Sequence, residues 1–159
     1  NPVGAHMSGC LGEFPVGIPE NLIPLLTQTA IGERDKLIIF GNDYDTPDGT
    51  CIRDFIHVSD VALAHISAFN YMKSNHEFYS VFNIGTGFGT SVGEIVSKFI
   101  EITGVDLNFE YGQRRKGDII ESWASCVKAE KELNWKSKFS IEDIITSAWN
   151  WQKKISSTF

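Results

Sequence analysis

Apolar residues recur along the chain with two spacings, one that suits amphipathic helices and one that suits short strands. The helical spacing predicts helices at about 20–31, 61–74, 92–102, 128–133 and 140–151. Short β-branched and aromatic runs predict strands at 37–40, 55–58, 81–84 and 107–111. Residues 1–17, with four glycines and two prolines, are expected to form a loop. These elements indicate a mixed α/β fold in one domain that spans residues 1–159.

Capping residues mark the expected helix ends. Ser91 and Glu94 have the S-x-x-E spacing of a capping box, before the helix at 92–102. Ser140 and Asp143 open the last helix in the same way. Asp60 stands where the N-cap of the second helix belongs, directly before an apolar run. The other expected cap and stop residues are Gly32, Gly104 and Ser125.

Two sets of residues are expected in the core. The helix at 61–74 carries small or apolar residues over much of its surface, so we expect it to be well buried. The tryptophans are expected to act as core and helix-packing aromatics. They are Trp123, Trp135, Trp149 and Trp151.

Composition narrows the functional class. The hydrophobic fraction of 42% and the charged fraction of 21% are those of an ordinary soluble globular protein. A formal net charge of −6 argues against nucleic acid or an anionic membrane as a partner. No apolar run approaches the roughly 18 residues of a membrane span. Cys10, Cys51 and Cys126 lack the CxxC spacing and are expected to stay reduced, which suits the cytosol.

Residues 41–60 combine a polar, turn-rich loop with a short strand and a helix start. Arg53 lies where the loop joins the strand, and a guanidinium there can bind a phosphate through two parallel hydrogen bonds. From residue type alone, an ion pair of Arg53 with Asp54 or with Asp48 at the surface is the favoured interpretation.

Two other features are interpreted as structural. The glycine-rich turn at 85–91 lies between a strand and a helix, but Thr90 occupies the place of the third glycine in a dinucleotide-binding fingerprint. We therefore expect a tight strand–helix turn. His57 alternates with apolar neighbours and is expected to be a core or edge histidine. No histidine or cysteine cluster has metal-ligand spacing, so no metal site is predicted.

Residues 41–60, GNDYDTPDGTCIRDFIHVSD, closely resemble a motif of the UDP-galactose 4-epimerase family, G-N-D-Y-x-T-x-D-G-T-x-x-R-D-[YF]-I-H-V-x-D. Every specified position is met. The chain starts where the second half of that family starts, so it is expected to be the C-terminal fragment of an extended short-chain dehydrogenase/reductase. The implied fold is a substrate-binding lobe plus the terminal elements of an NAD-binding Rossmann fold whose first half is absent. Further matching segments are NPVGAH, GIPENLIP, QRRKGD and KELNWK.

The resemblance implies a set of substrate-binding residues. Arg53 and Arg115 match arginines that bind the diphosphate of UDP, and Asp118 matches a carboxylate that binds its ribose. Ser122 stands where many family members have a tyrosine beside the C2 substituent of the hexose. Positions around the sugar and diphosphate are matched by Asn1, Asn21 and Leu22, and the segment beside the uracil by Ile38, Ile39 and Phe40.

The resemblance also implies the chemistry. Family members take hydride from sugar C4 onto bound NAD and return it to the other face of the 4-keto sugar, with a Tyr-x-x-x-Lys pair as the base. No tyrosine of this chain has a lysine four positions on. We therefore predict no catalytic residue in the chain, and an intact parent that is a cytoplasmic UDP-glucose 4-epimerase of galactose metabolism and a homodimer. NAD would be bound mainly by the missing N-terminal half.

Two alternatives stay open at this point. One is a related nucleotide-sugar decarboxylase or dehydratase, against which the NPVGAH segment and the long GNDY loop argue. The other is a non-catalytic module that binds a nucleotide sugar. The small Ser122 leaves space for an acetamide, so the parent is also expected to accept N-acetylated UDP-hexoses, and a tyrosine there to exclude them.

Overall fold

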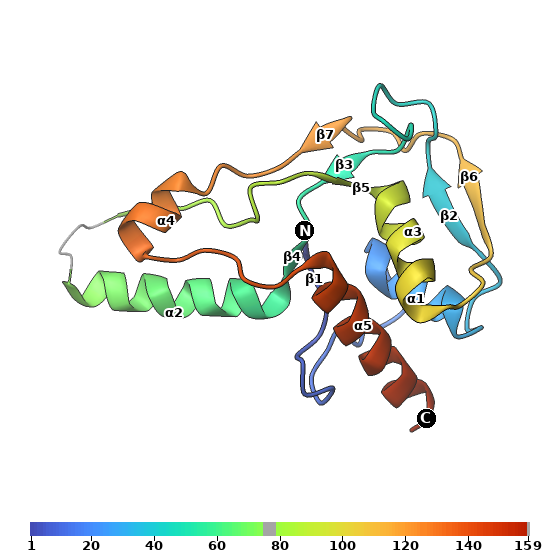
Figure 1. The fold of residues 1–159 in the computed structure, drawn as a ribbon, viewed down its shortest axis with the longest axis horizontal. Coiled ribbons are helices and arrows are strands. Elements are labelled where there is room, and N and C mark those ends of the chain that lie inside the picture. Colours follow the sequence, from blue (N-terminus) through green and yellow to red (C-terminus); the bar gives the residue numbers. More distant parts are fainter. Residues whose placement is uncertain (75–78, 159) are drawn as a thin grey trace.

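The computed structural model describes residues 1–74 and 79–158 and shows a mixed α/β fold (Figure 1). The fold class expected from the sequence is confirmed. The helices of these residues are α1 (Leu22–Ala30), α2 (Val58–Ser74), α3 (Val92–Thr103), α4 (Val127–Leu133) and α5 (Ile141–Ser156). The strands are β1 (Pro2–Val3), β2 (Leu37–Phe40), β3 (Ile52–Arg53), β4 (Ile56–His57), β5 (Thr90–Ser91), β6 (Phe109–Gly112) and β7 (Glu121–Ser122).

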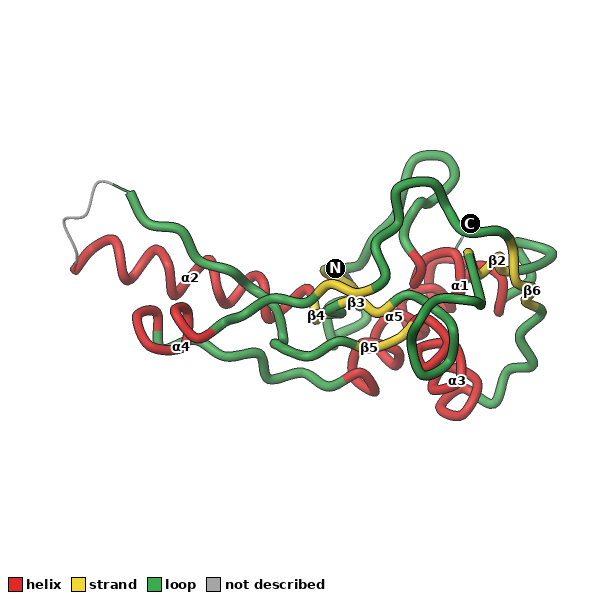
Figure 2. Tube along the Cα trace, turned by 90° about the horizontal axis from the view of Figure 1, so that it is seen from above, coloured by secondary structure: helices red, strands yellow, loops and turns green. Residues whose placement is uncertain are grey.

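The strands form three small sheets that bring distant segments together. β1 pairs in parallel with β4, and β2 pairs in parallel with β6, with Phe40 opposite Gly112. β3 lies between β5, which is antiparallel to it, and β7, which is parallel to it. The view from above shows β3 and β5 near the middle of the elongated molecule and β2 with β6 at one end (Figure 2). The β3 register places Arg53 opposite both Thr90 and Ser122.

The larger core lies between α1, α3 and α5 and includes Leu37 and Ile39 of β2, which packs on α1. Phe99 of α3 is fully enclosed and meets Trp149 of α5 edge to face, with the ring centroids 5.6 Å apart. α5 starts with the expected capping box, because Ser140 and Asp143 each bond the backbone of the other. The members of this core are Val3, Ile23, Leu26, Leu37, Ile39, Phe55, Ile95, Val96, Phe99, Leu107, Ile144, Ile145 and Ala148.

A smaller core joins α2 to α4 around the buried ring of Trp135. Its anchor is Asp60, whose carboxylate is fully buried and accepts the backbone N–H groups of Lys138 and Phe139 at 3.0–3.1 Å. The expectation that Asp60 is the N-cap of this helix is wrong, since α2 already begins at Val58. The carboxylate instead fixes the segment that leads into α5, a contact that local sequence does not reveal.

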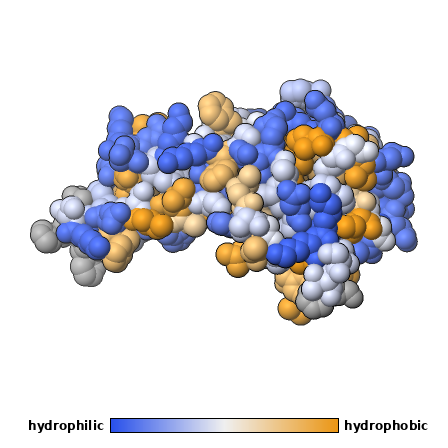
Figure 3. All heavy atoms as spheres, turned by 60° about the horizontal axis from the view of Figure 1, so that its bottom comes forward, coloured by the Kyte–Doolittle hydropathy of each residue, from blue (hydrophilic) through white to orange (hydrophobic). Residues whose placement is uncertain are grey.

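The expectation that α2 is well buried is also wrong. Within the helix only Asp60 and Ala64 are buried, while Ile66 and Phe69 are 57% and 58% exposed. α4, β1 and β4 pack on one side of α2, and the other apolar side faces outward. The underside of the molecule shows hydrophobic patches between hydrophilic ones (Figure 3). Apolar residues on both sides of a helix are typical of helices that are covered on both sides.

Smaller differences have local causes. The predicted strand at 81–84 is not formed, because no described strand lies alongside to pair with it; Phe82 and Ile84 pack on the smaller core instead. Pro2–Val3 is a strand within the expected loop, since β4 offers it a partner. Trp123 is 49% exposed, in contrast to the expected core position. α4 begins after Cys126 and has no side-chain cap, so Ser125 is not its N-cap.

Candidate functional site

One cavity of about 350 Å³ gathers most of the residues that the sequence singles out. It opens between the start of α1, the strands β2 and β3, and the loop at 113–118. Ser122 does not line it, although it pairs with Arg53 in the β3–β7 ladder. Nine of the ten predicted contact residues do line it: Asn1, Asn21, Leu22, Ile38, Ile39, Phe40, Arg53, Arg115 and Asp118. Their binding role stays a prediction, but their convergence is a property of the fold.

Arg53 is held at the cavity wall by the β3 backbone. Its guanidinium donates to the carbonyl oxygen of Ile52 at 2.8 Å and lies 3.6 Å from a carboxylate oxygen of Asp118. The side chain is only 18% exposed. The ion pairs with Asp54 or Asp48 that residue type favoured are not formed. Arg53 therefore faces the cavity with one carboxylate beside it and donors left for an anion.

Arg115 reaches the same cavity from the 113–118 loop. Its guanidinium carbon lies 4.6 Å above the ring of Phe40, a cation–π arrangement that orients the side chain. The β2–β6 pairing puts Phe40 directly opposite Gly112, just before the loop that carries Arg115. That loop turns back when the N–H of Asp118 donates to the carbonyl of Arg115 at 3.1 Å.

Asp48 and Asp54, the two alternative ion-pair partners of Arg53, bind other groups. Asp48 accepts hydrogen bonds from Thr50 and Ser91. Asp54 is buried, and its carboxylate accepts the N–H groups of Thr86, Gly87 and Ala124 and the hydroxyl of Thr86, at 2.7–3.3 Å.

The Asp54 contacts also explain the glycine-rich turn at 85–91. N–H groups that could bind a phosphate already bind this carboxylate, and a Cβ at Gly85 would lie 2.3 Å from it. The turn is therefore filled by the protein's own anion. The turn is structural, as expected, and its residues do not fit a dinucleotide pyrophosphate, but the strand expected before it at 81–84 is not formed.

His57 is a core histidine, as the sequence predicts. It is fully buried, stacks on Phe139 with ring centroids 4.3 Å apart, and contacts the Ser147 hydroxyl through Nε2 at 3.2 Å. The N–H of Ser59 donates to Nδ1, so the proton of the neutral ring belongs on Nε2. Burial lowers the pKa of His57, with attraction to Asp60 opposing it, which favours this neutral form.

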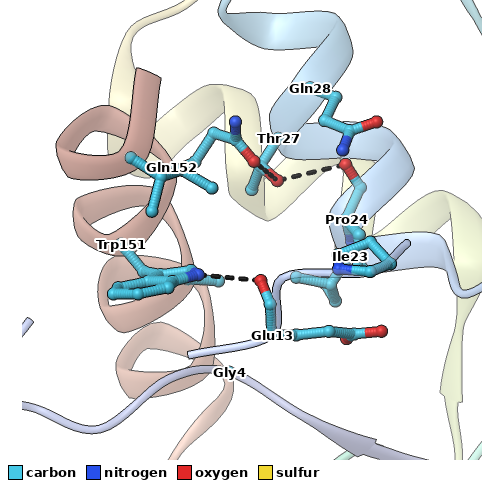
Figure 4. A pocket seen from close by; sticks show the side chains of 11 residues that line it. Gly4, Glu13, Ile23, Pro24, Thr27, Gln28, Trp151 and Gln152 are labelled. Atoms are coloured by element: carbon cyan, nitrogen blue, oxygen red, sulfur yellow. Dashed lines mark hydrogen bonds between the residues drawn. The ribbon is translucent and has the colours of Figure 1, made fainter. Parts of the chain in front are cut away.

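A second, much smaller cavity lies between α1, α5 and the segment around Glu13 (Figure 4). Its volume of about 20 Å³ suits one water molecule and excludes a nucleotide. Trp151 Nε1 donates to the carbonyl of Glu13 at 2.8 Å, and Thr27 bonds Gln152 across the helices. Gly12 lies so close to the Trp151 ring that a Cβ would come within 2.4 Å of it. The tryptophan thus fastens the 6–20 loop to α5.

Sequence reasoning missed several residues that line the large cavity. Cys51 precedes β3 and is buried, Leu37 opens β2, and Phe55 comes from the larger core. Leu37 could have been found, because it belongs to the same strand as three predicted contacts. Cys51 and Phe55 could not, since an apolar residue near a strand carries no ligand signal of its own.

The described residues form neither a metal-binding cluster nor a membrane-spanning helix. Residues 1–74 and 79–158 contain no group of three or more histidine, cysteine or acidic side chains placed to hold a metal ion. No helix within those ranges is both long and apolar enough to cross a membrane.

Three comparisons with known proteins each find a match over most of this chain. A family model described as GDP-mannose 4,6 dehydratase matches residues 7–148. UDP-glucose 4-epimerase of Yersinia enterocolitica is 49% identical over 153 residues, which cover 96% of this chain and 45% of that protein. The crystal structure of UDP-glucose 4-epimerase from Bifidobacterium longum in complex with NAD⁺ and UDP matches with a TM-score of 0.94 and 45% identity, covering 100% of this chain and 47% of that one.

A third relative is named for two sugars. The UDP-Glc/GlcNAc 4-epimerase of Campylobacter jejuni matches with a TM-score of 0.77 and 42% identity, over 87% of this chain and 42% of that one. The chain thus spans less than half the length of the relatives it matches, and it aligns with their C-terminal part. The resemblance to the C-terminal half of a 4-epimerase is confirmed.

Proposed function

The chain belongs to the family whose model is described as GDP-mannose 4,6 dehydratase, and from that premise we propose that it is the UDP-binding part of an NAD-dependent UDP-glucose 4-epimerase. The observation that carries the proposal is the convergence of Arg53 and Arg115 on one cavity that also contains an apolar wall. Two guanidiniums suit a diphosphate, and the apolar wall suits a flat base. The relatives of similar sequence are epimerases, which favours this reaction over decarboxylation or dehydration.

Each part of UDP has a proposed partner. The uracil lies against the β2 segment 38–40, the diphosphate lies between Arg53 and Arg115, and the ribose hydroxyls donate to the carboxylate of Asp118. Asn21 and Leu22 stand at the start of α1, beside the diphosphate. Asn1 stands beside the hexose.

The division of labour between binding and chemistry follows from the same residues. A 4-epimerase must hold the nucleotide firmly while the 4-keto sugar turns over, and this chain supplies the firm hold. NAD, which exchanges hydride with sugar C4, is assigned mainly to the half of the protein outside this chain, because the glycine-rich turn here is filled by Asp54. We also propose a homodimeric, cytoplasmic enzyme of galactose metabolism; the three free cysteines suit that compartment.

The first expected result is that the purified chain binds UDP without converting UDP-galactose to UDP-glucose. It contains the proposed nucleotide contacts but no Tyr-x-x-x-Lys pair. A coupled assay for UDP-glucose, run beside a full-length relative, measures conversion. Turnover by the chain alone at a rate near that of the relative would contradict the proposal.

The second expected result concerns Ser122, which is exposed on β7 beside Arg53. In the intact epimerase, Ser122→Tyr should lower kcat/KM for UDP-N-acetylglucosamine by at least about tenfold while UDP-galactose is spared, because the ring would fill the space of the acetamide. Assays of both substrates on wild type and variant measure the effect. A wild type inactive on the acetylated substrate, or equal losses on both substrates, would disprove this role for Ser122.

A further inference from the structure

The guanidinium of Arg114, the neighbour of Arg115, is hydrogen-bonded along its edge and stacked on its face. Its Nε donates to a carboxylate oxygen of Asp43 at 2.8 Å, and its terminal nitrogen donates to the backbone oxygen of the same residue. Its guanidinium carbon lies 4.2 Å above the ring centroid of Tyr44. The hydrogen bond from Arg114 holds the pKa of Asp43 below its usual value. One side chain thus ties the 113–118 loop to the 42–50 loop.

The Tyr44 ring beneath Arg114 is held in place by its burial and by its backbone. Tyr44 is buried, and its N–H donates to the carbonyl of Gly49 at 2.9 Å. Gly41 has a φ of +82°, and a Cβ there would lie 2.4 Å from the Tyr44 ring and 3.1 Å from Cγ of Arg114. The missing side chain of Gly41 therefore lets ring and guanidinium stack. The contact that Arg114 makes with Tyr44 is to the face of the ring.

The stacked cluster sits one residue away from the proposed ligand contacts. Arg115 follows Arg114 directly. The N–H of Asp118 donates to the carbonyl of Arg115 and closes a turn, so the carboxylate of Asp118 follows three residues after Arg115. Fixing the side chain of Arg114 fixes the backbone from which the adjacent Arg115 leaves the loop. On its inner side, the loop is held by the Phe40 ring and by Arg53.

We propose that Arg114, held by Asp43 and stacked on Tyr44, is a positioning residue that presents Arg115 to the diphosphate, an inference that rests on the proposed function. The competing interpretation is a solvated basic turn in which Arg114 only adds charge. Its side chain is 46% exposed, and an exposed ion pair by itself contributes little. The difference lies in geometry: two hydrogen bonds to one residue plus stacking fix the direction of the side chain, which charge alone does not.

The test is a calorimetric titration of UDP into the chain and its variants. Arg114→Ala should weaken UDP binding about fivefold, because the loop no longer holds Arg115 in place. Lys116→Ala removes the same charge from an exposed position of the same loop and should change the affinity by less than about twofold. In an Arg115→Ala background, adding Arg114→Ala should weaken binding by less than about twofold further, since a positioning residue has nothing left to position.

The outcomes separate the interpretations. Equal losses of affinity from Arg114→Ala and Lys116→Ala would mean that only the charge matters. Full additivity of Arg114→Ala with Arg115→Ala would show that Arg114 acts independently. Either result overturns the inference, and so does an unchanged UDP affinity in Arg114→Ala. A wild-type chain that binds no UDP would instead overturn the proposed function. Tryptic cleavage after Arg115 then decides the structural role: Arg114→Ala should accelerate it, and an unchanged rate would overturn the inference.

Discussion

Replacing either Arg53 or Arg115 by alanine is expected to weaken UDP binding by about 10–100-fold. The two guanidiniums come from separate segments, Arg53 from β3 and Arg115 from the 113–118 loop, so we expect each to make its own contacts. A charge-assisted hydrogen bond is worth about 1.5–3 kcal/mol, which corresponds to this range. Arg53→Ala should have the larger effect, because it also removes the cation beside Asp118 and leaves that carboxylate to repel the diphosphate. Calorimetric titration of UDP measures both losses.

A suitable control is Lys98→Ala, which removes one positive charge and a surface ion pair with Glu142 on the α3–α5 side of the molecule. It should leave UDP affinity unchanged within about twofold, because exposed charges at a distance are screened by salt. If Arg53→Ala and Arg115→Ala both bind UDP as the wild type does, the assignment of the diphosphate site is wrong.

Asp54→Ala is expected to lower the free energy of unfolding by about 3–5 kcal/mol. The buried carboxylate joins the strand region before β4 to the 85–91 turn and to the segment before α4. Its loss leaves several partly buried N–H groups without this acceptor, and a fully buried group left unpaired costs about 1–3 kcal/mol. Urea denaturation followed by circular dichroism measures the change.

The matched control for Asp54 is Asp106→Ala, which removes an exposed carboxylate from the same chain. A change within about 0.5 kcal/mol is expected there, as for most surface substitutions. Asp54→Asn should fall between the two, since its amide keeps one oxygen but turns an NH₂ toward the N–H donors. A loss below about 1 kcal/mol in Asp54→Ala would mean that the turn is held by other contacts.

The elements that the sequence predicts well are those with local causes. Leu37–Phe40 is a strand as expected, and Ser140 with Asp143 opens α5 through contacts made within four residues. Gly104 ends α3 in the left-handed conformation that glycine adopts easily. Such features need no knowledge of the rest of the fold.

The features that sequence reasoning misjudged depend on partners far along the chain. Asp60 looks like a cap but binds backbone groups near residue 138, and the 81–84 segment looks like a strand but has no described strand beside it. The outward side of α2 was expected to be covered because its residues are apolar. Apolar character indicates that a surface favours burial, but it does not say which residues supply the cover.

The candidate site divides along the same line. The resemblance singled out nine residues that the fold brings to one cavity, although they come from segments more than a hundred positions apart. It assigned a ligand role to Arg115 and no role to Arg114, and residue type does not explain the difference, since both are arginines in one basic turn. Only the contacts of Arg114 with Asp43 and Tyr44 separate a residue that holds the loop from one that faces the cavity.

The location of bound UDP is the most direct test of a nucleotide site in this chain. A crystal structure of the chain soaked with UDP should show the uracil against residues 38–40, the diphosphate between Arg53 and Arg115, and the ribose hydroxyls at the carboxylate of Asp118. UDP bound elsewhere, or an empty cavity at a saturating UDP concentration, would contradict the proposal that this part of the protein holds the nucleotide.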